Sequence, residues 1–253
     1  MTRIGVALSG GGHRASVFGA GLLLYLADAG RQGDVGAIAS VSGGSITNGV
    51  VAQEMDYRQA SAADVRAGLR PLLRHIAYTG LFFWGPSTNL YVITLFAVLG
   101  LGLLGLAAGL IMAFITGVGI AAGIVLAGSL VLVAAGVVIF AQRSKVVDRA
   151  LARAHFSRDG VPVSLASAAR SLDHVLCATE LQAGEHFYLS PRFLYSYRFG
   201  RGTPGDGLRL STAVQASACL PGAFASRRLA TSPTGSCAAL RSPSPRTSRG
   251  TCC

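Results

Sequence analysis

The sequence predicts an α/β fold with a mostly parallel sheet, interrupted by a two-helix transmembrane hairpin. Short apolar segments alternate with helix-compatible segments on both sides of the middle of the chain, an order typical of a parallel sheet covered by helices. The middle has no Asp, Glu, Lys or Arg between Arg74 and Arg143. A bilayer core of roughly 30 Å is crossed by about 20 helical residues, so this uncharged run can cross twice.

The first part of the chain contains two strand and helix pairs. Apolar residues indicate the strands, and each strand is followed by a segment with helical spacing. Gly30 marks the end of the first helix. We therefore expect a strand at 3–8, a helix at 14–29, a strand at 35–41, a helix at 43–55 and an amphipathic portion at 62–78.

The uncharged middle divides into helices at about 92–113 and 118–140, with the break near Thr116. A hairpin folded there brings Gly109 opposite Gly123 and Gly105 opposite Ala127, and small residues allow close helix packing in lipid. A buried hairpin in a soluble core is the alternative. Soluble helices rarely stay apolar on every face over such a length, so the membrane hairpin is favoured.

After the hairpin, strands return and the chain then changes character. The expected elements are a polar helix at 146–155, a strand at 172–179, and further strands or a strand pair at 185–189 and 193–199. The end is rich in Ser, Pro and Arg, which is typical of disorder. The expected parts are a first domain segment at 1–90, the hairpin at 91–141, a second domain segment at 142–230 and a disordered tail at 231–253.

Basic residues flank the hairpin on both sides. Two crossings leave both flanks on one side of the membrane, and the positive-inside bias places them in the cytoplasm. The first eight residues have too short an apolar core for a signal peptide. The net charge of +11 suits an anionic lipid surface. Nucleic acid is the other partner that such a charge can indicate, but the sequence has no basic stripe interleaved with aromatic residues. The flanking residues are Arg66, Arg70 and Arg74 before, and Arg143, Lys145, Arg149 and Arg153 after.

The five cysteines have no CxxC or other metal-ligand spacing. In a cytoplasmic setting they are most simply free thiols. We therefore expect no metal and no cofactor, and the pattern leaves the oligomeric state open.

Ser42 is the candidate nucleophile because it lies between a strand and a helix within a run of small residues. A strand-turn-helix elbow needs tiny residues two before and two after the nucleophile, where strand and helix nearly touch. Ser40 and Gly44 occupy these positions. Ser45 is a poorer candidate because Thr47 lies two residues beyond it. An ordinary serine at a helix N-terminus is the alternative interpretation.

Gly10, Gly11 and Gly12 follow the first strand and offer backbone N–H donors to a developing oxyanion. Arg14 is a candidate to support this loop or to bind a phosphate head group. The spacing Gly10-x-Gly12-x-x-Ala15 also fits a loose dinucleotide fingerprint. That motif expects an acid at the end of the next strand, whereas Asp34 precedes it.

Four segments in order resemble patatin-like phospholipases: 9–15, 40–45, 177–184 and 216–224. The resemblance implies a three-layer sandwich and lipid acyl hydrolysis by a Ser-Asp dyad. In that scheme Ser42 attacks the ester carbonyl of a phospholipid or glycerolipid, an aspartate acts as base, and Gly10 to Gly12 hold the oxyanion.

The chain departs from the family pattern at the base. The family aspartate lies in an Asp-Gly-Gly or Asp-Gly-Ala turn after the Pro-x-x-Phe segment, and no acid follows Phe224. Asp206 precedes that segment, where a polar turn is the simpler interpretation. None of His13, His75, His155, His174 and His186 has a triad setting.

We therefore expect a truncated or frameshifted domain end and an impaired enzyme. The alternative is a non-catalytic membrane protein that uses the domain as a lipid-binding or scaffolding module.

Overall fold

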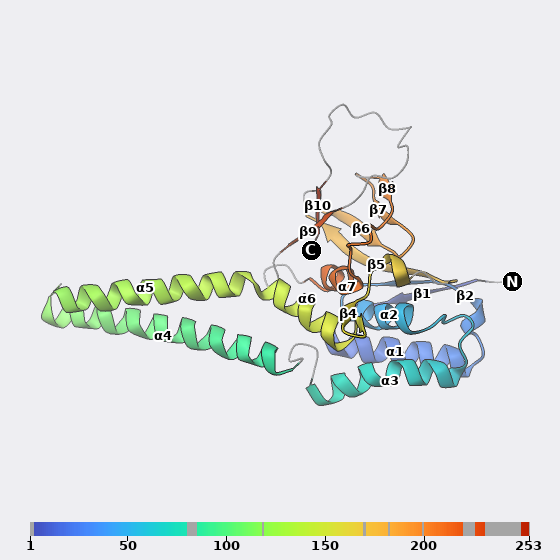
Figure 1. The fold of residues 1–253 in the computed structure, drawn as a ribbon, viewed down its shortest axis with the longest axis horizontal. Helices are drawn as coiled ribbons and strands as arrows, with labels where there is room; N and C mark the ends of the chain where they lie inside the picture. The colour runs from blue at the N-terminus through green and yellow to red at the C-terminus, as the bar shows by residue number, and fades with distance from the viewer. Residues whose placement is uncertain are drawn as a thin grey trace, which may run out of the picture. The chain divides into compact units, whose positions relative to one another are not determined.

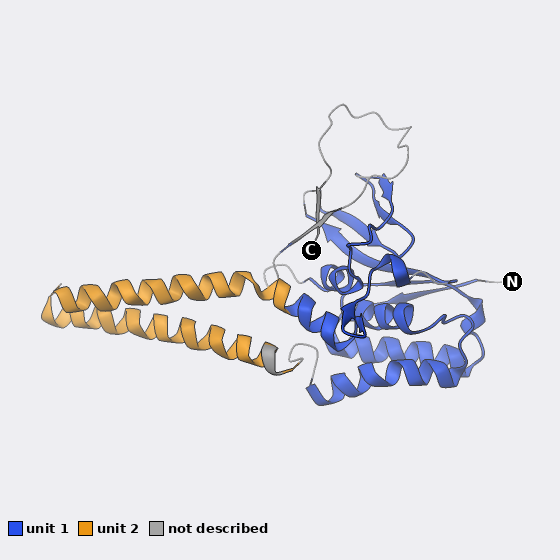
Figure 2. Cartoon of the chain, viewed as in Figure 1, with its two compact units in different colours: residues 1–82, 147–253 blue, residues 83–146 orange. Residues whose placement is uncertain are grey.

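The computed structural model describes residues 3–79, 85–117, 119–168, 171–181, 183–198, 200–219, 226–230 and 249–252. The chain divides into two compact units (Figure 2). Unit 1 comprises Met1–Phe82 and Val147–Cys253, and unit 2 comprises Phe83–Val146. Each unit is described separately below.

The centre of unit 1 is a mixed sheet with a parallel core (Figure 1). Strands β1 (Ile4–Leu8), β2 (Val35–Ser40) and β5 (Asp173–Glu180) are parallel neighbours. The register pairs Leu8 with Ser40 and Ser40 with Leu176, so the carboxyl ends of β1 and β2 lie at one edge. The antiparallel strands that continue from β5 are β6 (Glu185–Leu189), β7 (Leu194–Ser196) and β8 (Gly200–Gly202).

One further strand pair belongs to this sheet, and another forms a sheet of its own. Strands β9 (Arg227–Ala230) and β10 (Arg249–Cys252) pair with each other, and β10 also pairs with the end of β5. Strands β3 (Ser157–Arg158) and β4 (Val161–Pro162) form a separate sheet. Of the expected disordered tail at 231–253, all except 249–252 lies outside the described residues.

Helices cover one face of the parallel strands. Helix α2 (Gly43–Glu54) packs on β2 and β5, and α1 (Gly12–Asp28) packs on α2 (Figure 1). Helix α3 (Ala62–Thr79) packs on both α1 and α2, and α7 (Leu210–Ser217) packs on α2 and β5. Fully buried side chains at this interface include Leu23, Ile38, Val51, Leu69 and Leu176.

The opposite sheet face carries smaller and less buried side chains. Strand side chains alternate between faces, so Ala7, Ala39 and Cys177 point away from the layer that buries Leu8 and Leu176. Among the described residues, no helix is packed on this second face next to β1 and β2.

The start of α3 follows from a capping box. The Ser61 amide and hydroxyl donate to Asp64 Oδ2 at 3.0 and 2.7 Å, and the Asp64 amide donates back to Ser61 Oγ at 3.2 Å. These hydrogen bonds lower the pKa of Asp64. The helix then buries Val65, Leu69 and Ile76 on one side, which explains its amphipathic sequence.

Unit 2 is a helical hairpin of α4 (Pro86–Thr116) and α5 (Ile120–Ala141). Both helices are long and apolar enough to cross a membrane, with mean hydropathies of 2.5 over Thr88–Thr116 and 2.8 over Ile120–Ala141. Two such helices favour a membrane protein only weakly by themselves. Helix α6 (Arg143–Ala154) follows directly.

The predicted pairing of glycines across the hairpin is wrong. A Cβ at Gly105 would lie 2.3 Å from Ser129 Oγ, and one at Gly109 would lie 2.8 Å from a Leu126 methyl carbon. A Cβ at Gly123 would meet no atom within 4 Å. The break falls where it was expected, but α4 ends at Thr116 and α5 begins at Ile120, which centres the turn one or two residues beyond residue 116 and displaces the partners.

The structure confirms the α/β class with parallel central strands. The helices and strands expected in the first part begin and end within a few residues of their predicted positions. The sequence analysis did not anticipate β8, the β3–β4 hairpin or α7.

Candidate active site

Ser42 occupies a strained turn between β2 and α2. Its φ of 54° and ψ of −122° lie outside the regions that residues with a side chain normally adopt. The Val41 amide donates to the Leu8 carbonyl at 3.1 Å, and the Ser45 amide donates to the Ser42 carbonyl at 2.9 Å. This is the backbone geometry of a nucleophile elbow, in which the serine projects from a sharp bend.

The elbow depends on two glycines that follow Ser42. A Cβ at Gly43 would lie 2.0 Å from the Gly12 carbonyl oxygen. A Cβ at Gly44 would lie 2.7 Å from Leu8 Cβ and 2.8 Å from the Leu8 carbonyl oxygen. Only glycine fits at these close approaches. The small-residue requirement used in the sequence analysis therefore has a direct steric cause at Gly44.

The glycine loop lies beside the elbow. A Cβ placed on Gly10 would be 3.2 Å from Ser42 Cβ and 3.9 Å from Ser42 Oγ. Gly11 and Gly12 have φ values of 140° and 62° and begin α1. In the described part of the chain, the amides of Gly10 to Gly12 donate no hydrogen bond to another residue. Of these three residues, Gly10 lies directly beside Ser42, while the backbone of Gly12 closely approaches the next residue, Gly43.

Ser16 connects the glycine loop to the turn at Ser42 through hydrogen bonds. Its hydroxyl donates to the Gly43 carbonyl at 2.5 Å and lies 3.4 Å from the Gly12 carbonyl. Thr47 Oγ1 donates to the Ser16 carbonyl at 2.8 Å. Both side chains are fully buried, so these hydrogen bonds hold the starts of α1 and α2 together away from water.

A buried network of hydroxyl and amide groups underlies the elbow. Ser45 Oγ lies 2.7 Å from Ser217 Oγ and donates to Ser40 Oγ at 3.0 Å. Asn48 Nδ2 donates to Ser40 Oγ at 2.9 Å, and Asn48 Oδ1 lies 2.7 Å from His174 Nδ1. Ser45 is fully buried within this network, which leaves Ser42 as the accessible serine of the elbow.

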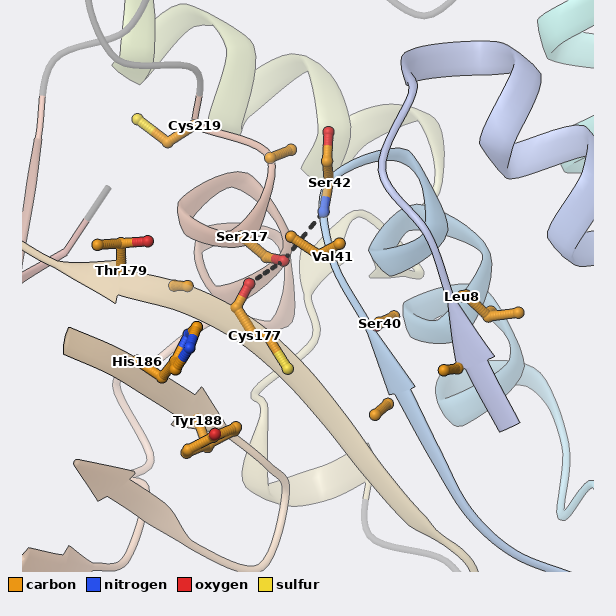
Figure 3. A pocket seen from close by; sticks show the side chains of 14 residues that line it. Leu8, Ser40, Val41, Ser42, Cys177, Thr179, His186, Tyr188, Ser217 and Cys219 are labelled. Atoms are coloured by element: carbon orange, nitrogen blue, oxygen red, sulfur yellow. Dashed lines mark hydrogen bonds between the residues drawn. The ribbon is translucent and has the colours of Figure 1, made fainter. Parts of the chain in front are cut away.

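Helix α7 contributes to the elbow through Ser217. The Ser42 amide donates to the Ser217 carbonyl at 3.1 Å and is also within 3.2 Å of Ser217 Oγ. Ser217 Oγ in turn donates to the Cys177 carbonyl at 2.6 Å on β5 (Figure 3). At the other end of α7, the Ser211 hydroxyl donates to buried Asp148 at 2.7 Å. Residues from three distant segments therefore fix the turn.

A cavity of about 510 Å³ opens beside Ser42 on the sheet face opposite the helices. Val41 and Tyr188 give it apolar walls, and Thr179 and His186 add polar groups (Figure 3). Ala39 is a further apolar wall residue. Burial raises the pKa of the Cys177 thiol, another wall residue. Within the described residues, no His, Cys, Asp and Glu side chains gather as a metal-binding group.

The structure describes no base hydrogen-bonded to the Ser42 hydroxyl among the residues it covers. Asp206 is exposed in a turn closed by the Leu208 amide and the Gly205 carbonyl, and it does not line the cavity. His186 lines the cavity, whereas His174 is bonded beneath the elbow. The Pro-x-x-Phe segment at 221–224 lies outside the described residues.

Arg14 is exposed on the first turns of α1. Among the described residues it forms no ion pair and its side chain makes no hydrogen bond. Its role in supporting the loop or a phosphate stays a prediction.

Sequence reasoning missed Ser217, Asn48 and His174 as supports of the elbow. Ser217 lies within the 216–224 segment, but neither spacing nor composition connects its hydroxyl with Ser42. Asn48 lies on the helix after the elbow, four residues along from Gly44, which was the one available signal.

No protein-family model matches the chain, and no curated protein matches its sequence. Its fold is similar to solved structures of human GIVD cytosolic phospholipase A2. One, in complex with methyl gamma-linolenyl fluorophosphonate inhibitor and terbium chloride, has a TM-score of 0.51 at 16% identity. Another, in complex with methyl gamma-linolenyl fluorophosphonate, has a TM-score of 0.49 at 15% identity.

Each comparison covers 86% of this chain and 29% of the human chain. The chain thus spans less than a third of the length of that protein. At this level of identity the similarity concerns the fold.

Proposed function

We propose that the chain is a membrane-anchored lipid acyl hydrolase of the patatin-like type, with Ser42 as nucleophile and Gly10, Gly11 and Gly12 as the oxyanion hole. The observation that carries the proposal is the strained turn at Ser42 beside the glycine loop, whose Gly10 lies next to the Ser42 side chain. A hydroxyl and a set of donors at one strand edge are the minimum equipment for acyl transfer.

In the first step, Ser42 Oγ bonds to the ester carbonyl carbon and the carbonyl oxygen becomes the oxyanion. The amides of the glycine loop donate to that oxygen, and the positive end of α1 adds to the stabilisation. The ester C–O bond then breaks, the alcohol leaves with a proton, and water later releases the acyl group from Ser42. The apolar cavity beside Ser42 suits an acyl chain.

Turnover also requires a group that takes the Ser42 proton. The described residues supply none to the hydroxyl, and the sequence has no acid after Asp206. We therefore expect slow ester hydrolysis, since a nucleophile without its base retains a small part of the rate. Hydrophobic helices α4 and α5 would anchor the protein, with both basic flanks and the domain in the cytoplasm.

The test is labelling of the full chain in detergent or nanodiscs with an alkyl fluorophosphonate probe. Wild-type protein should be labelled, and Ser42→Ala should not. Ser9→Ala is the matched control, because it removes an exposed hydroxyl from the neighbouring loop and should leave labelling intact. Labelling that survives in folded Ser42→Ala protein, or is lost in Ser9→Ala, would contradict the assignment.

A second function is supported by the mostly apolar cavity beside Ser42. The same cavity could hold a lipid without cleaving it, and the domain would then act as a lipid-binding or scaffolding module. Folded wild-type protein that binds a fluorescent phospholipid but never reacts with the probe would favour this second function.

A further inference from the structure

The exposed face of α3 carries three arginines spaced four residues apart. Arg66, Arg70 and Arg74 are all exposed, and Tyr78 continues the series with 83% of its surface accessible. Residues at this spacing lie on one side of a helix, so the series runs about 18 Å along α3. We call Arg66, Arg70, Arg74 and Tyr78 the arginine stripe.

Helix α1, which packs against α3, carries two exposed aromatic side chains. Phe18 and Tyr25 are 72% and 68% exposed on its outer side. Arg66 forms an ion pair with Asp28 at 3.1 Å, which joins the start of α3 to the end of α1. The two helices pack together and run antiparallel, so the later part of the stripe extends beside α1 toward its glycine-loop end (Figure 1).

Within the described residues, Arg66 is the one arginine of the stripe in an ion pair, while Glu54 and Asp56 lie with Asp64 beside Ala67 and Gly68 of the same helix. In the described part of the chain, Arg70 and Arg74 form no ion pair. Among the acids of α1 and α3, Asp28 pairs with Arg66 and Asp64 accepts the hydrogen bonds of its capping box. Arg14 adds a further exposed cation at the start of α1.

The geometry points to a docking surface for anionic lipid head groups, formed by the arginine stripe of α3 and by Phe18 and Tyr25 of α1. Arginine binds phosphate oxygens, and exposed aromatic rings settle at the interface between head groups and acyl chains. The combination of arginines and aromatic side chains could not be predicted from the sequence, because the arginines lie on α3 whereas Phe18 and Tyr25 lie on α1.

A lipid surface is favoured over other polyanions by chain continuity. Only residues 80–85 separate the end of α3 from the first of the two helices that are apolar enough to span a membrane. Basic segments next to a membrane helix are attracted to the anionic cytoplasmic leaflet. The inference rests on the membrane anchoring in the proposed function and is independent of acyl transfer.

The experiment compares hydrogen exchange of the full chain in nanodiscs of phosphatidylcholine alone and with about 30% phosphatidylserine. We expect α3 and α1 peptides to exchange roughly tenfold more slowly in the anionic discs, and less so at high salt. Arg70→Gln with Arg74→Gln should abolish most of this slowing, because each arginine near the surface contributes roughly fivefold to the affinity for anionic lipid. Arg198→Gln with Arg201→Gln is the charge-matched control and should retain it.

Equal exchange of α3 in the two kinds of disc would overturn the inference, as would loss of the effect in the control variant. Slowing of α3 by a short RNA in neutral discs to the same degree would also overturn it, because the surface would then bind polyanions in general. Peptides of α4 and α5 separate the two proposals. If α4 and α5 are protected from exchange in both kinds of disc while the exchange of α3 does not depend on lipid charge, only the docking inference fails. If they are unprotected, the anchoring fails as well.

Discussion

Substitution of Gly43 by alanine tests whether the glycine loop and the Ser42 turn act together. The added Cβ would lie 2.0 Å from the Gly12 carbonyl oxygen and 2.8 Å from its carbonyl carbon. Both are backbone atoms, so no side chain can rotate to make room. Because Cβ atoms do not approach other heavy atoms within 3.0 Å, loop and elbow must separate by 1 Å or more.

The expected consequence is a large loss of reactivity with a moderate loss of stability. A displacement of about 1 Å at a reacting centre costs on the order of 100-fold in rate. Overpacking of this kind destabilises a protein by about 1–3 kcal/mol. The assay is the second-order rate of fluorophosphonate labelling, together with urea unfolding of the same preparations.

Two further variants complete this test. Gly21→Ala is the matched control on the exposed side of α1, since its Cβ would meet no atom within 4 Å. It should react normally and gain up to about 1 kcal/mol from helix propensity. Gly10→Ala, with a Cβ 3.2 Å from Ser42 Cβ, should fold even if the first variant does not, and should react more slowly. Wild-type rates in folded Gly43→Ala and Gly10→Ala would refute the role of the loop.

Three other predictions concern stability. Ser42→Gly should stabilise the fold by about 1 kcal/mol, measured by urea unfolding, because glycine tolerates a φ of 54° and ψ of −122°. A destabilised variant would show that the turn is not strained. Asn48→Ala should destabilise the fold by about 2 kcal/mol in the same assay. It removes the side-chain amide that is hydrogen-bonded to His174 and to the carbonyls of Ile38 and Val175. An unchanged urea midpoint would show that this network contributes little to stability. Burial and then the neighbouring His75 lower the pKa of His155 to about 4, so the stability present above pH 6.5 should decline as the pH falls toward 4, by at most about 3 kcal/mol. His155→Gln should flatten that decline in thermal unfolding measured against pH, and an unaltered slope would assign it to other groups.

The parts of the fold set by local pattern were predictable from the sequence. Strands β1 and β2 are short apolar runs that end at glycine or serine turns, and α1 stops at the glycine-marked end of its periodic segment. Ser42 was recognisable because its neighbours in sequence, including Gly44, are also its neighbours in space. The two helices of unit 2 followed from composition alone.

Features that depend on distant residues were not predictable. Ser217 reaches Ser42 only after the whole hairpin and β5 have intervened, so no local spacing indicates the contact. The pairing of Gly105 across the hairpin required the exact turn position, and an error of one or two residues there displaces every partner. Ser40 replaces the usual glycine of an elbow, and its hydroxyl has a use that appears only with Asn48 in place.

The contact between Ser42 and Ser217 also determines when, during translation, the turn at Ser42 can form all its hydrogen bonds. The two acceptors of the Ser42 amide are made 175 residues after it, which takes roughly 10 to 35 seconds at the usual speed of translation. During that interval both apolar helices leave the ribosome and can enter the bilayer. Under the proposed anchoring, the nascent polypeptide would meet lipid before the Ser42 amide has its acceptors.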